Sequence, residues 1–269
     1  MVTKSSKIGT RKSSHVSGEL RFEGPGIGNL VASLSALTES APSAEFAVIG
    51  GLAVLARLGG AHRVTDDLDT VATQHGDEPT VVEAVIAAQG VGGLLKGTKV
   101  DCIAVGDVPA AELSVERLPD VEEDRIFVLA HRWALDTADE LTLIAETDGT
   151  IAARVRCRFA APASLVAMKL QSAPRRGGAR ADKAGGDYLD LFRLVSHPAM
   201  TRSIAISLRA APHDLGPWCS LEITRCMIED ADRTVGLIVR SGVAESNVPT
   251  ATQFRRAGEL LIDWIQQVP

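Results

Sequence analysis

The chain has 269 residues, of which 45% are hydrophobic and 23% are charged, and its formal net charge is −6 at pH 7. This composition is typical of a folded globular protein with one large domain or two small ones, and no apolar run is long enough to span a bilayer. The negative charge argues against a surface covered in phosphate-binding groups, although it is compatible with a local basic patch. The four cysteines show no spacing typical of a disulfide framework or a zinc site, so we expect free thiols in a reducing cytoplasm.

The first part of the chain is rich in serine and basic residues but lacks the apolar stretch of a secretory signal. We interpret residues 1–18 as a flexible basic arm, either without function or as a weak electrostatic tether to nucleic acid. Strand-like segments dominate residues 19–159, and helical periodicity dominates residues 160–269. The sequence therefore predicts an α+β fold, in which an N-terminal mixed sheet with flanking helices precedes a C-terminal helical bundle.

The first strong pattern is Glu45–Leu58, which predicts a buried strand, a turn at Gly50-Gly51 and a helix that ends at Gly59-Gly60. Alternation of apolar and polar residues then predicts strands, and a segment rich in alanine and valine predicts a helix over Thr80–Gln89. The predicted strands are Leu68–Ala72, Thr98–Val105 and Thr150–Phe159. In the last strand, arginines alternate with apolar residues, so one face is either solvated or able to bind phosphate; these are Arg154, Arg156 and Arg158.

The second half begins with a run of good helix formers, Ala163–Ser172. A loop is expected over Pro174–Gly186, and helical spacing resumes over Asp187–Ser196. From His197 onward the periodicity predicts roughly three more helices, with turns near Pro212–Pro217 and Gly242–Pro249.

Asp67 and Asp69 are the leading candidates for metal ligands. Side chains two residues apart on a strand share one face, and two carboxylates held that close repel each other unless a cation lies between them. Mg²⁺ favours one or two carboxylates together with substrate phosphates. Asp101 adds a third ligand if its predicted strand pairs beside the first. The alternative is an ordinary acidic turn.

Gly50 and Gly51 precede this acidic segment, at the junction of a predicted strand and helix. Glycines at a helix N-terminus allow backbone N–H groups to approach a triphosphate closely. A simple tight turn is the alternative reading of the same pair.

Taken in order, these residues resemble the AbiEii-type branch of the DNA polymerase β-like nucleotidyltransferases, which includes the MenT toxins of toxin–antitoxin pairs. The resemblance spans about Phe46 to Leu194 and is carried by Gly50-Gly51, by the pattern Arg63-x-Thr65-x-Asp67-x-Asp69, by the strand with Asp101, and by Leu165–Leu194. Lys169 matches the family's later lysine, and either Asp187 or Asp190 matches its aspartate. Gly185-Gly186 stands where the family often has a charged residue, which leaves the geometry of Lys183 and Asp187 open.

The resemblance implies a cytoplasmic enzyme that uses Mg²⁺ or Mn²⁺ to transfer NMP from an NTP to the 3′ acceptor end of tRNA, which blocks translation. A cognate antitoxin is the implied protein partner. The implied catalytic residues are Asp67, Asp69, Asp101, Lys169 and Asp187, and the first three would hold the metal. Nucleotide binding would fall to Gly50, Gly51, Arg63, Thr65 and Asp190.

The predicted loop carries four cations among glycines, namely Arg175, Arg176, Arg180 and Lys183. These residues either follow an RNA phosphate backbone or belong to a mobile surface loop. Aromatic residues make up only 4% of the chain, so RNA recognition by shape and phosphate contacts is expected rather than base stacking.

Two other functions fit the same residues. The first is a small-molecule nucleotidyltransferase of the antibiotic-modifying type, for which an acidic cleft is expected because such acceptors are cationic. The second is a non-catalytic binding module that kept the fold, against which the presence of Asp67, Asp69 and Lys169 argues.

Overall fold

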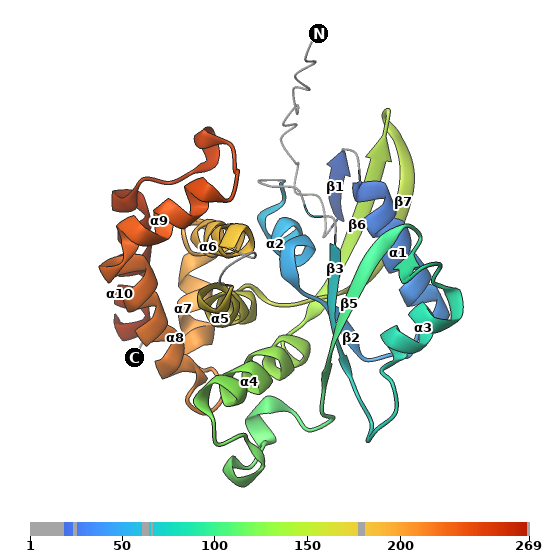
Figure 1. Cartoon of the computed structure of the whole chain (residues 1–269), viewed down its shortest axis with the longest axis horizontal. Coiled ribbons are helices and arrows are strands. Elements are labelled where there is room, and N and C mark those ends of the chain that lie inside the picture. The colour runs from blue at the N-terminus through green and yellow to red at the C-terminus, as the bar shows by residue number, and fades with distance from the viewer. Residues whose placement is uncertain (1–18, 24–25, 61–64, 66, 177–180, 268–269) are drawn as a thin grey trace.

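The structure is a computed structural model that describes residues 19–23, 26–60, 65, 67–176 and 181–267. Three sequence predictions lie outside these residues: the basic arm, Arg63 and Arg180. Within the described residues the fold is α+β, with a seven-stranded mixed sheet and ten α-helices (Figure 1). The predicted fold class is confirmed at this level.

The sheet has the strand order β1-β6-β7-β2-β3-β5-β4. Neighbouring strands run parallel in the pairs β1–β6, β7–β2 and β3–β5 and antiparallel in the others. The strands are β1 Glu19–Glu23, β2 Phe46–Val48, β3 Asp67–Thr73, β4 Leu94–Leu95, β5 Thr98–Val105, β6 Asp139–Thr147 and β7 Thr150–Phe159. The strands predicted at 98–105 and 150–159 are confirmed, and the one predicted at 68–72 is longer by one residue at each end.

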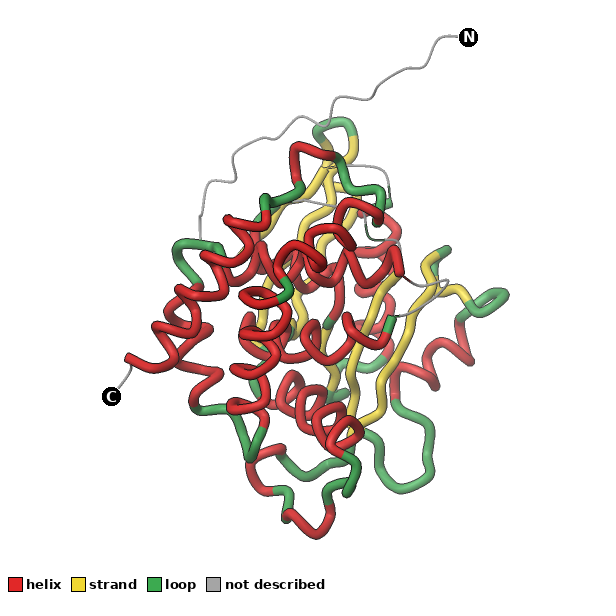
Figure 2. Tube along the Cα trace, turned by 60° about the vertical axis from the view of Figure 1, so that its left-hand side comes forward, coloured by secondary structure: helices red, strands yellow, loops and turns green. Residues whose placement is uncertain are grey.

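The helices are α1 Ile27–Ser40, α2 Gly50–Leu58, α3 Val81–Gln89, α4 Glu122–Asp136, α5 Pro162–Ser172, α6 Ala181–Val195, α7 Thr201–Arg209, α8 Leu215–Ile223, α9 Ala231–Arg240 and α10 Ala251–Gln267. Helices α1 and α3 lie on one side of the sheet, and α5 to α10 lie together on the other side, with α2 between them and β3 (Figure 1). Figure 2 shows this helical layer in front of the strands.

Two local predictions are confirmed by their capping residues. Thr80 caps α3, because its side chain accepts a hydrogen bond from the Glu83 N–H while Glu83 accepts one from the Thr80 N–H. Gly59 ends α2 in the left-handed conformation at φ 65°. Gly50, which the sequence placed in a turn between strand and helix, is the first residue of α2.

The loop predicted over 174–186 is wrong in its second half, because α6 begins at Ala181 and contains both glycines. Gly185 lies where α6 crosses α9: a Cβ placed there would come within 2.7 Å of Ser241 Cβ and 2.9 Å of the Leu237 carbonyl carbon. The glycine serves close helix packing rather than a turn. The described part of the tail holds four α-helices instead of roughly three, because an unpredicted break at Asp230 separates α9 from α8 and its π-helical continuation Thr224–Glu229.

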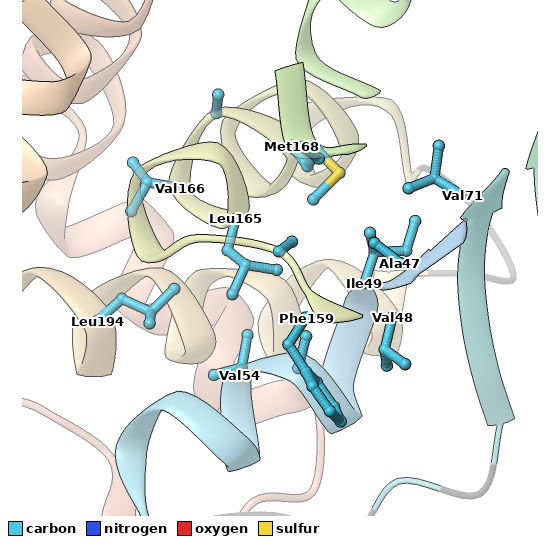
Figure 3. Packing of buried hydrophobic residues seen from close by; sticks show 14 of the residues in the cluster. Ala47, Val48, Ile49, Val54, Val71, Phe159, Leu165, Val166, Met168 and Leu194 are labelled. Atoms are coloured by element: carbon cyan, nitrogen blue, oxygen red, sulfur yellow. The ribbon is translucent and has the colours of Figure 1, made fainter. Parts of the chain in front are cut away.

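The hydrophobic core is centred on β2, whose three residues are all buried. Phe159 at the end of β7 is fully buried beside β2, near Val54 of α2 and Leu165 of α5 (Figure 3). Apolar residues from the sheet and from both halves of the chain therefore pack as one continuous core. This packing fixes β2, α2 and β3 relative to α5.

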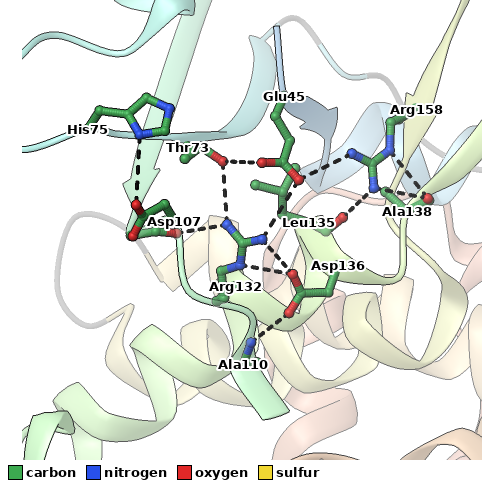
Figure 4. Close-up of polar contacts among 11 residues, drawn as sticks. Glu45, Thr73, His75, Asp107, Ala110, Arg132, Leu135, Asp136, Ala138 and Arg158 are labelled. Carbon is green, nitrogen blue, oxygen red and sulfur yellow. Dashed lines mark hydrogen bonds and ion pairs between the residues drawn. The ribbon is translucent and has the colours of Figure 1, made fainter. Parts of the chain in front are cut away.

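A buried arginine joins α4 to the far end of β3. Arg132 is 4% exposed and donates to Asp136 Oδ1 at 2.8 Å and to the Gly106 carbonyl oxygen at 2.7 Å, and it lies 3.7 Å from a Glu45 carboxylate oxygen (Figure 4). These contacts compensate the buried charge and hold α4 against the end of β3. The network gathers near Thr73, at the opposite end of β3 from Asp67.

The arginine face of β7 is paired with glutamates on neighbouring elements. Arg154 forms an ion pair with Glu19, and Arg156 forms one with Glu140. Arg158 lies 3.8 Å from a Glu45 carboxylate oxygen and also donates to the Leu135 carbonyl oxygen at 2.7 Å. The sequence left open whether this face is solvated or binds phosphate; the three arginines are instead engaged by carboxylates, which argues against phosphate binding.

Candidate functional site

The acids at the start of β3 and in β5 lie on one face of the sheet. Asp67 and Asp69 flank Leu68, which is fully buried on the opposite face. Strand β5 runs parallel to β3, in a register that places Asp101 beside Asp69 and Lys99 beside Asp67. The strand pairing on which the sequence prediction for Asp101 depended is therefore present.

Asp101 does not converge with the other two acids on one point. Its carboxylate forms an ion pair with Lys99, two residues earlier on the same strand. Within the described residues, no group of three or more histidine, cysteine, aspartate or glutamate side chains is arranged to hold a metal ion. The site therefore consists of a carboxylate pair, Asp67 and Asp69, with a third acid beside it that is held by a lysine.

The hydrogen bond from Lys99 to Asp101 raises the pKa of the ammonium above its usual range, against a smaller opposing effect of burial. The charges of Asp101, Asp67 and Asp69 raise it further. Lys99 is thus a charged neighbour of all three acids at neutral pH.

Asp69 lies in a crowded and partly desolvated position. Burial raises the pKa of its carboxyl, and the negative charges of Asp101 and Asp67 raise it further, while the positive charges of Lys169 and Arg176 oppose the shift. The Asp69 side chain leaves no room for a side chain at position 50, because a Cβ on Gly50 would lie 2.7 Å from Asp69 Cγ. The φ of Gly50 is +67°, which also favours glycine.

Across from these acids, a buried lysine lies between two buried aspartates. Lys169 of α5 is 6% exposed, and its Nζ lies 2.6 Å from Asp187 Oδ1 and 2.8 Å from Asp190 Oδ2. The two aspartates are three residues apart on α6 and so share one helix face. The sequence left open which of them partners the lysine; both do.

Asp187 has two further donors. Ser172 Oγ donates to its Oδ2 at 3.0 Å, and Arg176 Nε lies 2.7 Å from the same oxygen. The arginine therefore connects the segment after α5 to α6 beside Lys169. The positive charge of Arg176 also opposes the rise in the pKa of Asp69, so this cation belongs to the candidate site.

Lys183 connects α6 to β3, since its Nζ lies 3.6 Å from Asp67 Oδ2. It precedes Asp187 by one helical turn, so the two glycines between them leave one continuous helix over the site. Arg175 points elsewhere and lies 3.1 Å from Glu123 at the start of α4. The three described cations of the predicted RNA-binding group are therefore all paired with carboxylates.

The remaining predicted nucleotide-binding residues lie close to these acids. Gly51 is buried in the first turn of α2, whose N-terminus has no side-chain cap. Thr65 Oγ1 donates to the Asp67 carbonyl oxygen at 3.4 Å, which is a weak local contact.

Sequence reasoning missed two polar residues of the site, Lys99 and Ser172. Lys99 carried a usable signal, because it lies two residues before Asp101 in a predicted strand and so shares its face. Ser172 carried none, because its contact with Asp187 depends on how α5 and α6 pack.

The described residues contain no helix with the length and apolarity needed to cross a membrane. Comparison of the chain with protein-family models, with curated proteins and with solved structures finds no match.

Proposed function

We propose that the protein is a cytoplasmic, metal-dependent nucleotidyltransferase that transfers NMP from an NTP to the 3′ acceptor end of tRNA. In this proposal residues 19–159 form the nucleotidyltransferase domain and residues 160–269 a helical bundle. The supporting observation is the placement of Asp67 and Asp69 on one face of β3, against the N-terminus of α2 and near the buried cation Lys169.

The donor set fits Mg²⁺ or Mn²⁺. Asp67 and Asp69 offer hard carboxylate oxygens on one strand face, and Mg²⁺ sites in proteins use one or two carboxylates together with substrate phosphates. The negative charges of Asp101 and Asp67 raise the pKa of Asp69 by electrostatic repulsion, and a bound cation would offset this repulsion. When bound, the ion would polarise the α-phosphate and neutralise charge on the triphosphate.

The uncapped N-terminus of α2 is the proposed phosphate-binding element. Its first backbone N–H groups have no side-chain cap, and the positive end of the helix dipole favours an anion there. In the proposed reaction the acceptor hydroxyl oxygen bonds to the α-phosphorus, and the bond to the bridging oxygen breaks, so that pyrophosphate leaves with the electron pair. The hydroxyl proton would pass to a carboxylate on the acceptor side, for which Asp101 is the candidate.

Lys169 is proposed to act as a fixed charge behind the acids. Its two aspartates hold the ammonium in place and offset its charge, so it lowers the cost of ionising Asp69 without attracting free anions strongly. Arg176 and Lys183 are cations beside the site that the triphosphate or the RNA end could engage once their present partners are released.

One observation favours a second candidate, transfer to a cationic small molecule. Among the described residues, Arg175, Arg176 and Lys183 are all engaged by carboxylates, so the face near the site is not a free cationic surface. A cationic acceptor of the antibiotic type would suit such a surface better than RNA does.

Incubation with each α-³²P-labelled NTP and Mg²⁺, in parallel with total tRNA and with a panel of aminoglycosides, separates these acceptors. Label on tRNA, removed by trimming of the 3′ end, is the expected result. Label on an aminoglycoside alone would establish the second candidate, and label on neither acceptor with any NTP would contradict both.

The proposal that the protein is a toxin rests on the resemblance of Leu165–Leu194 to the AbiEii-type nucleotidyltransferase toxins. Induced expression of the wild-type chain is expected to arrest bacterial growth, whereas the Asp69→Asn variant at the same protein level does not. Equal arrest by both proteins would remove nucleotidyl transfer as the cause of toxicity.

A further inference from the structure

We propose that the ammonium of Lys99 occupies the place of a second metal ion, so that the site binds one divalent cation rather than two. This inference rests on the proposed function, because it takes Asp67 and Asp69 as the ligands of that single cation. It concerns a residue that the sequence motifs did not single out.

The strand register places Lys99 among the acids. On the shared face of β3 and β5, Lys99 lies beside Asp67, and Asp101 lies beside Asp69. Residues paired across neighbouring strands are about 5 Å apart, and residues two apart on a strand are about 7 Å apart. The lysine is therefore within side-chain reach of both neighbouring carboxylates, on the face where a metal would sit.

The third carboxylate is already engaged by this lysine. Lys99 and Asp101 form a direct ion pair, and both side chains are about half exposed. Two-metal sites hold their ions about 3.5–4 Å apart, and Asp101 is the carboxylate on this face that the first cation does not use. A second cation beside Asp101 would have to displace the ammonium from the carboxylate and would be repelled by it at short range.

The covalent attachment of Lys99 to β5 gives it an advantage over a free ion. Its position on the strand is fixed by the ladder between β3 and β5, so its local concentration does not depend on the metal concentration in solution. Once the first cation lies between Asp67 and Asp69, the lysine still supplies one positive charge on the acceptor side.

Lys183 is a second exposed ammonium near these acids, but its contact is different. Its Nζ lies 3.6 Å from Asp67 Oδ2, which is longer than a hydrogen bond, and the residue comes from α6 rather than from the sheet. Lys183 therefore competes with the first cation at Asp67 and leaves Asp101 untouched. This makes it a matched control, because its removal takes the same charge from the same site.

The experiment counts bound Mn²⁺ per chain by electron paramagnetic resonance while the full chain is titrated with Mn²⁺ alone. Wild type is expected to bind one ion, and Asp67→Asn none. Lys99→Met is expected to bind two, and Lys99→Arg, which keeps the charge, one. Lys183→Met is expected to bind one ion, roughly two- to fivefold more tightly than wild type.

The outcomes separate this inference from the proposed function. Two ions on wild type, or one ion on Lys99→Met, would overturn the role of Lys99 while leaving a metal site at Asp67 and Asp69. No ion on wild type would show that Asp67 and Asp69 hold no cation without a nucleotide, and would overturn the inference while leaving the labelled-NTP assay to decide the proposed function. Thermal melting of each variant checks the fold, which the exposed position of Lys99 predicts to be unaffected.

Discussion

The contact between Gly50 and Asp69 is the tightest constraint at the scale of single residues. Alanine at Gly50 would have to adopt φ +67° and would press its Cβ against the Asp69 carboxylate. Gly149 is a matched control, because its φ is +76° and nothing lies within 4 Å of a Cβ placed there. Both variants are expected to lose about 1–2 kcal/mol of stability from backbone strain.

Gly50→Ala is expected to lose a further ~1–3 kcal/mol through overpacking, and nucleotidyl transfer with it. Chemical denaturation and the labelled-NTP assay measure the two effects. Equal behaviour of the Gly50 and Gly149 variants in both assays would show that the carboxylate tolerates the methyl group.

The pairing of Lys169 with two buried aspartates makes a second prediction. Lys169→Met removes this cation from both carboxylates. It is expected to lower the free energy of unfolding, measured by urea denaturation, by about 3–5 kcal/mol. Adding Asp190→Asn is expected to restore part of the loss, because the carboxyl of Asp190 is then neutral. Unchanged stability of the single variant would contradict the pairing.

The positions of the three acids could be predicted from sequence, because strand geometry determines which side chains share a face. The two-residue period of a strand is enough to place Asp67 and Asp69 on one face, and a second strand pattern places Asp101. Sequence reasoning did not find that Asp101 is bound by Lys99, because a lysine in a strand is normally read as a solvated side chain. The partners of Asp187 also depend on tertiary packing that local spacing does not encode.

Helix α6 shows how an element was misread. Two consecutive glycines indicate a loop by propensity, since each costs about 1 kcal/mol in a helix relative to alanine. The crossing with α9 overrides that preference at Gly185, where any side chain would overlap the neighbouring backbone. Only the three-dimensional packing reveals this, and α6 as a whole carries Lys183, Asp187 and Asp190 across the site.

The two glycines of α6 therefore respond oppositely to alanine. Gly185→Ala is expected to cost about 1–3 kcal/mol, because α6 and α9 must separate. Nothing lies within 4 Å of a Cβ placed on Gly186, so Gly186→Ala is expected to stabilise the helix by up to about 1 kcal/mol. Urea denaturation of both variants tests the crossing, and a neutral or stabilising Gly185→Ala would contradict it.

At the scale of the whole molecule, buried His131 makes the free energy of unfolding depend on pH. Its Nδ1 lies 2.7 Å from the Phe127 carbonyl oxygen, and burial lowers its pKa from 6.5 to about 4. The unfolded chain therefore binds a proton that the folded chain does not as pH falls from about 6.5 to about 4, which removes up to about 3 kcal/mol of stability over that window.

His131→Gln is expected to flatten this part of the stability profile, measured by urea denaturation at a series of pH values. His75 is exposed on the surface, so His75→Gln is the control for replacing a histidine outside the core. An identical pH dependence in wild type and His131→Gln would contradict the buried neutral state of the ring.

The α+β class could be predicted for the whole chain because strand and helix periods separate near Phe159. The strand order could not, since it depends on β1, β4 and β6, which carry weak patterns, and on a core that joins both halves. The candidate site lies where those halves meet, with its acids on β3 and β5 and its buried lysine on α5.

Asp69 is the residue on which the proposed nucleotidyl transfer most depends, and its surroundings disfavour its negative charge. Its carboxyl has a raised pKa because burial and neighbouring acids disfavour the charge, so folding is weakened by this group at neutral pH. The most direct test is label transfer from an α-³²P-labelled NTP by Asp69→Asn relative to wild type, with thermal melting of the same samples. Transfer by the variant is expected to be lower by about 100-fold or more, with a melting temperature equal to or above that of wild type. Undiminished transfer by Asp69→Asn would rule out this role of the carboxylate.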